Sequence, residues 1–223
     1  TRKNLTLGFP EDFNKLELSR GYNEHTKKLE PIPHEIIENG PVFENVLEGD
    51  EIDVTKFPAP LWNPEDGGRY IGTGCFIITR DPDTGWINCG TYRVMIHDEK
   101  RVALYISPGK HGRIHRDKYM AKGEPMPVCI VVGTDPLSFL TSSTEAPEGM
   151  CELDMMGAYR GHAVQCVTGK HTGLPFPAAS EVVIEGVIHP GNTAPEGPFG
   201  EWLGYQGGRM EAEPWVDISA IYH

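Results

Sequence analysis

The 223-residue sequence is poor in basic residues and lacks both long apolar runs and paired cysteines, and each absence excludes a class of protein. Lys and Arg number 20 against 32 Asp and Glu, so the formal net charge is −12. Binding to phosphate backbones needs clustered Lys and Arg, which argues against a general nucleic-acid binder. No apolar run approaches the roughly 20 residues of a membrane span, and the start, TRKNLTLGFPEDF, has no signal-peptide core.

The five cysteines are odd in number and widely scattered, with no C-x-x-C spacing. We therefore expect reduced thiols in a cytoplasmic protein. Cys75, Cys129 and Cys166 lie in apolar, strand-like runs, which predicts that they belong to the core. Neither G-x-G-x-x-G nor G-x-x-x-x-G-K-[ST] occurs, so ordinary dinucleotide-binding and P-loop folds are not predicted.

From residue 69 onward the sequence contains a succession of β-rich runs. TGCFIITR, INCGTYRVMIH and RVALYIS are joined by the turns DPDTG and HDEK, which predicts an antiparallel meander. Further strands are predicted for PMPVCIVVG, HAVQCVTG, SEVVIEGVI and WVDISAIY, the last two half-buried. Helices are predicted for HGRIHRDKYMAKG, for the segment after Asp135-Pro136 and for CELDMMGAYRG. This pattern predicts an α+β fold, a barrel or split β-barrel of mainly antiparallel strands with short helices.

Residues 1–60 are Pro-rich and weakly periodic. We expect them to form a truncated N-terminal segment or linker that leads into one domain over residues 61–223. Short helices are predicted around Asp12–Ser19 and over HEIIENG, ended by Gly40. The start without Met and the strand-like end, EPWVDISAIYH, predict that the chain is part of a larger protein.

The segment PEGPFGE places Glu196 and Glu201 five residues apart where Pro and Gly prevent a regular helix. Two carboxylates in an apolar pocket commonly have separated pKa values, and one of them then donates a proton near neutral pH. An acidic surface turn is the alternative explanation of this segment.

Three further segments carry candidate cation or anion ligands. Asn88, in a strand pattern, offers an oxygen suited to Mn²⁺ or Mg²⁺, and Arg93 offers a guanidinium for a carboxylate or phosphate. His111 stands at the start of a predicted helix, where backbone amides favour an anion. Glu152, at the edge of an apolar stretch, needs a cation or a hydrogen-bond partner. A turn residue, a surface strand residue and a structural histidine remain the alternatives for the first three.

The order of these motifs resembles the UbiD-type decarboxylases, which use prenylated FMN. The resemblance runs from about Val42 to the C-terminus and rests on Trp86-x-Asn88-x-Gly90-x-Tyr92-Arg93, Lys110-His111-Gly112, Glu152-x-x-x-x-Gly157-Ala158, SEVVIEG and PEGPFGE-x-x-GY. DGGRYIGTG and TRDPDTG also match. The resemblance implies a flavin-reductase-like split barrel.

The resemblance also implies roles for individual residues. Asn88, His111 and Glu152 match the divalent-cation ligands, usually of Mn²⁺. Trp86, Ser142 and Ser143 lie where the family binds K⁺, although a helix C-terminal loop would equally explain the two serines. The cofactor-contacting positions are Thr91, Tyr92, Arg93, Tyr105, Ile106, Ser107, Lys110 and His111. The catalytic trio would be Arg93, Glu196 and Glu201.

The function that the resemblance implies is reversible, non-oxidative decarboxylation of an aromatic or α,β-unsaturated carboxylic acid, with a flavin prenyltransferase supplying the cofactor. Family members are roughly twice as long and homo-oligomeric, and this chain lacks their C-terminal dimerisation domain, so we expect a monomer. A non-catalytic flavin- and metal-binding module, or a fragment that needs missing domains or partner subunits, is one alternative. A metal-dependent hydrolase using Asn88, His111 and Glu152 is another.

Overall fold

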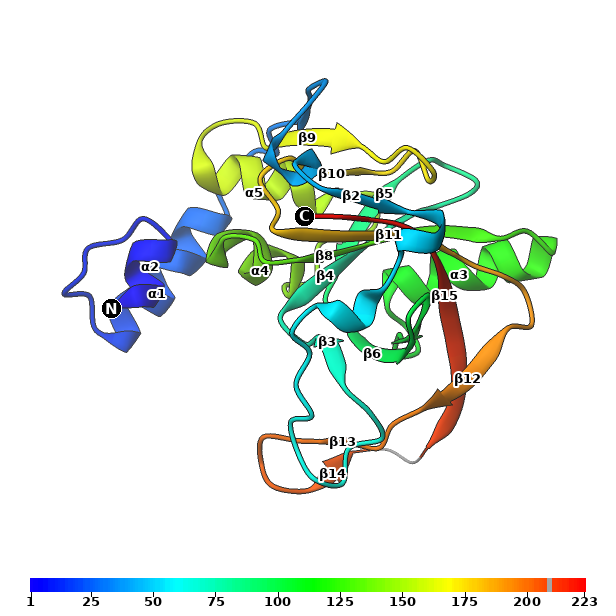
Figure 1. Cartoon of the computed structure of the whole chain (residues 1–223). Coiled ribbons are helices and arrows are strands. Elements are labelled where there is room, and N and C mark those ends of the chain that lie inside the picture. Colours follow the sequence, from blue (N-terminus) through cyan, green and yellow to red (C-terminus); the bar gives the residue numbers. More distant parts are fainter. Residues whose placement is uncertain (208–209) are drawn as a thin grey trace.

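A large antiparallel sheet of ten strands forms the body of the molecule in the computed structural model, which describes residues 1–207 and 210–223 (Figure 1). Its main path runs β3-β6-β7-β15-β11-β8-β4-β5, and β2 and β12 also pair with β15. In chain order its strands are β2 (Val46–Glu48), β3 (Tyr70–Gly72), β4 (Cys75–Arg80), β5 (Ile87–Gly90), β6 (Arg93–Asp98), β7 (Arg101–Tyr105), β8 (Met126–Val132), β11 (Val182–Ile188), β12 (Thr193–Glu196) and β15 (Glu211–Tyr222).

Two small sheets and a set of short helices complete the fold. The three-stranded sheet contains β1 (Glu35–Ile36), β9 (Gln165–Thr168) and β10 (Pro175–Pro177), and a two-stranded sheet contains β13 (Phe199–Gly200) and β14 (Gln206–Gly207). The α-helices are α1 (Arg2–Thr6), α2 (Lys15–Thr26), α3 (His111–Lys122), α4 (Pro136–Ser142) and α5 (Glu152–Arg160). Single 3₁₀ turns span η1 (Pro41–Phe43), η2 (Gly49–Glu51) and η3 (Val54–Lys56). The predicted α+β split barrel of mainly antiparallel strands is confirmed.

The central strands of the large sheet are buried on both faces. In β4, Cys75 and Ile77 join one hydrophobic cluster, whereas Phe76 and Ile78 join the other. This follows from the two-residue period of a strand, which points successive side chains to opposite faces. The second cluster also contains Leu153 of α5 and residues of the small sheet, so these elements cover the outer face. The predicted burial of Cys75, Cys129 and Cys166 is confirmed.

The predictions for the helices after residue 110 are confirmed, and their local causes are visible. Gly123 ends α3 in the left-handed conformation, with φ of 69°. The Asp135 side chain caps α4 by accepting hydrogen bonds from the amides of Leu137 and Ser138. α4 and α5 lie near one another beside the sheet, whereas α1 and α2 project from one side of the molecule (Figure 1).

Two predictions for the N-terminal region need correction. HEIIENG does not form a helix, because Glu35–Ile36 pairs with β9 and the amide of Ile37 donates to the carbonyl of Cys166. The first predicted helix begins later and runs further than Asp12–Ser19, because Asn14 and Glu17 form a capping box at the start of α2. β2 pairs with β15, so part of the first 60 residues belongs to the large sheet.

The run INCGTYRVMIH forms two strands, where one was predicted. β5 pairs with β4, whereas β6 pairs with β3 and β7, and the chain leaves the ladder at Thr91 and Tyr92. The hairpins β4–β5 and β6–β7 have the predicted turns. β5 lies at one end of the strand order and β6 next to the other end, so the break between them carries the chain from one end of the sheet to the other. Among the described residues, no helix has the length and apolar character needed to cross a bilayer.

Glu185 is a fully buried carboxylate in β11, a strand that is covered on both faces and not half-buried as predicted. It accepts hydrogen bonds from the Tyr222 hydroxyl at 2.6 Å, the Thr172 amide at 2.6 Å and the His171 amide at 3.1 Å. A buried charge is tolerated only with such partners. The network therefore ties β11 to β15 and to the turn after β9.

Replacing Tyr222→Phe should lower the free energy of unfolding by about 1.5–3 kcal/mol, the usual contribution of a hydrogen bond to a charged group. The substitution keeps the aromatic packing and removes only the hydroxyl. Urea unfolding measures the change. Tyr205→Phe, at an exposed tyrosine, is the matched control and should shift stability by less than about 0.5 kcal/mol. Equal effects of the two substitutions would contradict the role of the Glu185 network.

Candidate functional site

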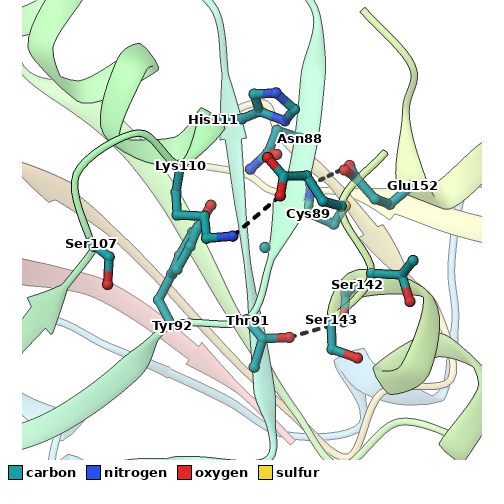
Figure 2. Close-up of a pocket in the computed structure, with 13 residues that line it drawn as sticks. Asn88, Cys89, Thr91, Tyr92, Ser107, Lys110, His111, Ser142, Ser143 and Glu152 are labelled. Atoms are coloured by element: carbon teal, nitrogen blue, oxygen red, sulfur yellow. Dashed lines mark hydrogen bonds and ion pairs between the residues drawn. The ribbon is translucent and has the colours of Figure 1, made fainter. Parts of the chain in front are cut away.

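A cavity of about 110 Å³ lies where β5 ends, beside the N-termini of α3 and α5 and the C-terminus of α4. Residues far apart in the sequence line it (Figure 2). Asn88, His111 and Glu152, the three predicted divalent-cation ligands, all contribute to its wall. Figure 2 shows them along one side, with Thr91 and the serines at the end of α4 across from them. The fold thus brings this predicted ligand set together.

Glu152 is the first residue of α5 and is 2% exposed. Its Oε2 accepts a hydrogen bond of 2.7 Å from the Cys89 amide. Burial raises the pKa of its carboxyl to about 7, while backbone hydrogen bonds act in the opposite direction. A cation in the cavity would offset this burial by favouring the carboxylate. The oxygens of Asn88 and Glu152 are hard donors that suit Mn²⁺ or Mg²⁺, and the imidazole of His111 adds a common metal-binding nitrogen, so the residues fit a divalent cation.

Tyr92 fixes the end of β5 against the start of α3. Its ring packs against Gly90 and Gly112, where an added Cβ would lie 2.2 Å and 2.8 Å from ring or hydroxyl atoms. Its hydroxyl accepts a hydrogen bond of 3.2 Å from the Gly112 amide. Burial raises the pKa of this hydroxyl, so it remains protonated at neutral pH. Glycine at both positions allows the close contact that places Asn88 near His111.

Lys110 brings positive charge to the rim of the cavity. Its Nζ lies 3.5 Å from Oε2 of Glu145, and both side chains are half exposed or more. An ion pair this exposed contributes little stability, so an entering anion can replace Glu145 as the partner of Lys110. Ser107 also lines the cavity, and α3 begins there without a side-chain cap from Lys110. The predicted cofactor contacts Thr91, Tyr92, Ser107, Lys110 and His111 therefore share one cavity.

Arg93, the first residue of β6, makes the best-defined ion pair of the region. Its Nε and Nη2 donate to the two carboxylate oxygens of Glu196 at 2.8 and 2.7 Å. Glu196 is 1% exposed and accepts a further hydrogen bond of 2.8 Å from the Tyr70 hydroxyl. The guanidinium lies over the ring of Tyr105 at 4.3 Å and near that of Phe199 at 5.5 Å. Such a paired, two-point contact holds the planar guanidinium in one orientation.

Glu201 lies between β13 and β14 rather than in the sheet. Its amide donates to the Tyr205 carbonyl at 2.7 Å. Within residues 1–207 and 210–223, no hydrogen bond or ion pair joins its carboxylate to Arg93 or to any other group. Trp202, next to it, is 89% exposed. The structure therefore joins two of the three predicted catalytic residues directly and places the third on a nearby surface hairpin.

The other predicted positions lie at or behind the cavity. Ser142 and Ser143 line it, and their hydroxyls donate to the Phe139 and Leu140 carbonyls. Trp86 is outside the lining, and its carbonyl accepts a hydrogen bond of 2.8 Å from the Asp81 amide. Its ring instead packs edge-on against His111 at 4.8 Å between centroids.

Two predicted cofactor contacts lie away from the cavity wall. Tyr105 packs under the guanidinium of Arg93, and the side chain of Ile106 is fully buried in the core. The Ile106 carbonyl accepts a hydrogen bond of 3.2 Å from Nη1 of Arg113. Neither side chain lines the cavity.

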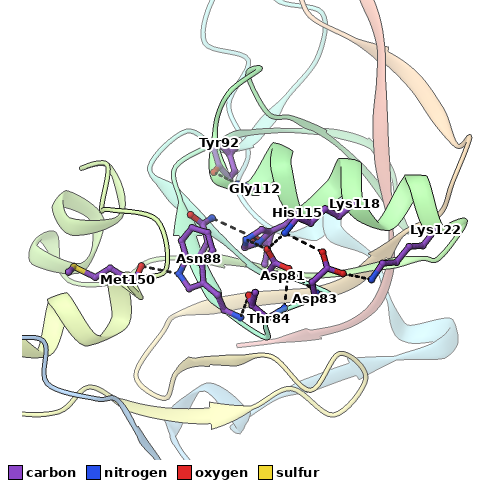
Figure 3. Close-up of polar contacts among 12 residues, drawn as sticks. Asp81, Asp83, Thr84, Asn88, Tyr92, Gly112, His115, Lys118, Lys122 and Met150 are labelled. Atoms are coloured by element: carbon purple, nitrogen blue, oxygen red, sulfur yellow. Dashed lines mark hydrogen bonds and ion pairs between the residues drawn. The ribbon is translucent and has the colours of Figure 1, made fainter.

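A buried polar network behind Asn88 was not found from the sequence (Figure 3). His115, in the second turn of α3, is fully buried, and its Nδ1 lies 2.9 Å from the Thr79 hydroxyl. Its Nε2 lies 3.8 Å from Oδ2 of Asp81, which also accepts a hydrogen bond of 2.6 Å from Lys118. Burial lowers the pKa of His115 to about 4, so its imidazole is neutral at neutral pH. Tyr70 was also missed, although a tyrosine in a buried strand needs a polar partner.

His34, Cys151 and Asp154 place one nitrogen, one sulfur and one oxygen within 4.8 Å of one another, outside the cavity. The Asp154 carboxylate already accepts hydrogen bonds from the ring of His34 at 2.7 Å and from its amide at 2.9 Å. Burial raises the pKa of Cys151 to about 12 and so disfavours the thiolate that a metal requires. This group fastens the chain before β1 to α5.

Comparison with known proteins gives one consistent result. The sequence model described as "UbiD: 3-octaprenyl-4-hydroxybenzoate carboxy-lyase Rift-related domain" matches residues 35–223. The chain is 36% identical to the pyrrole-2-carboxylic acid decarboxylase of Pseudomonas aeruginosa over 194 residues, which cover 87% of this chain and 39% of that protein. It thus spans less than half the length of that relative.

Solved structures agree. The vanillic acid decarboxylase of Sedimentibacter hydroxybenzoicus in closed form superposes with a TM-score of 0.91 at 30% identity, over 99% of this chain and 48% of that one. An evolved dimeric form of the UbiD-class enzyme HmfF from Pelotomaculum thermopropionicum, in complex with prFMN, gives 0.90 at 27% identity, over 100% and 50%. The resemblance inferred from the motifs is confirmed, and the chain belongs to the UbiD family.

Proposed function

We propose that this chain provides the cofactor-binding half of a prenylated-FMN-dependent decarboxylase that removes CO₂, reversibly and without oxidation, from an aromatic or α,β-unsaturated carboxylic acid. The observation that carries the proposal is the paired, buried Arg93–Glu196 contact. It lies one residue beyond Thr91 and Tyr92, which line the cavity of the three cation ligands. Relatives described as decarboxylases, one in complex with prFMN, support this reaction class.

The cavity suits the phosphate end of the cofactor. At about 110 Å³ it is smaller than the roughly 300 Å³ at which pockets for whole organic ligands begin, so it has room for a cation and a phosphate group only. Asn88, His111 and Glu152 would hold Mn²⁺, and Lys110 and Ser107 would contact the phosphate. Ser142 and Ser143, with the carbonyl of Trp86, would hold K⁺. The divalent cation would anchor the cofactor phosphate and need not act as a Lewis acid in the reaction.

Arg93, Glu196 and Glu201 would bind and protonate the substrate. The cofactor, when bound, supplies the electron sink for the reaction. Arg93, held flat by Glu196, would orient the substrate carboxylate. When the bond between the reacting carbon and the substrate carboxylate breaks, CO₂ leaves without the electron pair of that bond. The pair then forms a new C–H bond with a proton from Glu201, which takes the place of CO₂ on the carbon. Solvent then reprotonates Glu201, which its place on a surface hairpin permits.

The activity belongs to the whole protein, of which this chain represents about half by comparison with its relatives. We propose a cytoplasmic location, a flavin prenyltransferase as supplier of the cofactor, and a homo-oligomer for the whole protein. The alternative, a flavin- and cation-binding domain without catalysis, is favoured by the absence, among described residues, of a contact between Glu201 and Arg93. Prenylated-FMN absorbance without CO₂ release from any aromatic acid would support that alternative.

Replacing Glu201→Gln in the intact protein should leave cofactor absorbance unchanged and lower the decarboxylation rate by about 10²–10⁴-fold, the usual contribution of a general acid. Hydrogen–deuterium exchange at the reacting carbon of the product should fall with it. Glu124→Gln, at an exposed glutamate after α3, is the control. Unchanged turnover would remove Glu201 from the proposed proton transfer.

Replacing Arg93→Lys should lower kcat/KM by about 10²-fold or more, because an ammonium cannot make the two parallel hydrogen bonds that Glu196 accepts. Cofactor content, read from absorbance, should stay within about twofold. Arg101→Lys is a matched control, since Arg101 pairs with Asp98 at the surface of the adjacent strand. A loss of activity that is the same for both variants would count against the role of Arg93.

Replacing Glu152→Gln should weaken Mn²⁺ binding by about 10²-fold, because a charged ligand becomes neutral. Titration followed by Mn²⁺ electron paramagnetic resonance measures this directly, with or without flavin. Glu148→Gln changes an exposed carboxylate outside the cavity and should leave the affinity unchanged. Equal affinities for all three proteins would refute the cation site.

A further inference from the structure

Thr79 and Asn88 face each other across the β4–β5 ladder. Residues directly opposite in an antiparallel pair project to the same face, so their side chains meet. Both are buried, and Nδ2 of Asn88 lies 3.5 Å from the Thr79 hydroxyl oxygen. The same hydroxyl lies 2.9 Å from Nδ1 of His115. A buried path of polar groups therefore leads from the cavity wall into the body of α3 (Figure 3).

The amide nitrogen of Asn88 sets the direction of the donors in this path, because it faces the Thr79 hydroxyl oxygen. Asn88 can offer only Nδ2–H to the hydroxyl oxygen in this contact, so the single Thr79 proton is directed at Nδ1 of His115. The neutral imidazole then carries its proton on Nε2, which faces Oδ2 of Asp81 at 3.8 Å. Asp81 is fixed by Lys118 at 2.6 Å and by the amides of Asp83 and Thr84. The path therefore ends at the Asp81 carboxylate, which is fixed by three hydrogen bonds.

The Asn88 carboxamide is turned with its nitrogen toward Thr79. With Nδ2 committed to Thr79, the oxygen is left for the cavity. Among the described residues, Oδ1 of Asn88 accepts no hydrogen bond. It is nevertheless not a buried unsatisfied atom, because it keeps some exposure. The opposite orientation would present an N–H to a cation and would draw the Thr79 proton away from Nδ1 of His115.

We propose that Thr79 and His115 are positioning residues that hold the Asn88 carboxamide with its oxygen toward a divalent cation. The proposal rests on the cation site of the proposed function. Groups that orient a metal ligand typically change metal affinity by about 10–100-fold when they are removed. They touch neither the ion nor the substrate, so their effect must appear first in cation binding.

A double-mutant cycle on the intact protein tests this, with Mn²⁺ affinity read by electron paramagnetic resonance. Thr79→Val preserves shape and removes the hydroxyl, and it should weaken Mn²⁺ binding by about 10-fold or more. In a protein that already carries Asn88→Asp, adding Thr79→Val should weaken Mn²⁺ binding by less than about twofold. The two oxygens of a carboxylate are equivalent, so the ligand no longer needs to be oriented. Thr168→Val, on an exposed strand position, is the control.

A second pair of variants separates positioning from folding. His115→Gln keeps an acceptor for the Thr79 hydroxyl and should retain affinity within about threefold, whereas His115→Leu should lose about 10-fold. Thermal unfolding of each variant reports whether it folds. A loss from Thr79→Val that is equal in both Asn88 backgrounds, or no loss at all, would overturn the proposal. If the unsubstituted protein binds no Mn²⁺, the proposed cation site itself fails, and this inference fails with it.

Discussion

The structure depends on the hydrogen-bond and ion-pair partners that its buried carboxylates find. A buried charge is costly unless it is paired and hydrogen-bonded, and the three most deeply buried glutamates meet this requirement in different ways. Glu185 is surrounded by hydrogen-bond donors, and Glu196 is paired with a guanidinium and a tyrosine. Glu152 has one backbone donor and a raised pKa, and it faces a cavity. Of the three, Glu152 is the carboxylate whose surroundings are incomplete without a further positive charge.

The break between β5 and β6 connects this incomplete site to Arg93. If residues 87–97 formed one continuous strand, Asn88 and Arg93 would lie along one straight ladder. The chain instead leaves β5 at Thr91, turns around the ring of Tyr92 and enters β6 at Arg93. Because of this turn, residues 88–92 line the cavity while Arg93, the next residue, pairs with Glu196. Gly90 and Gly112 are necessary for it, since a side chain at either would collide with Tyr92.

The sequence predicted those features that local chemistry determines. Asp135-Pro136 marked the start of α4 and Gly123 the end of α3, because caps and stops act within a few residues. The strand break and the pairing of Glu35–Ile36 with β9 escaped prediction because partners distant in sequence decide them. The same holds for the site. Asn88, His111 and Glu152 were recognisable from their motifs, whereas Thr79 and His115 became visible only once β4 was seen to pair with β5.

The different settings of Glu196 and Glu201 explain how two nearby carboxylates can serve different purposes. Both oxygens of Glu196 are engaged by Arg93 and one also by Tyr70, so its carboxylate holds the guanidinium in one orientation. Among the described residues no ion pair engages the Glu201 carboxylate, and the next residue of its hairpin, Trp202, is almost fully exposed. The proton donor of the proposed reaction must be reprotonated after every turnover, and this difference in setting is why we propose Glu201 for that role.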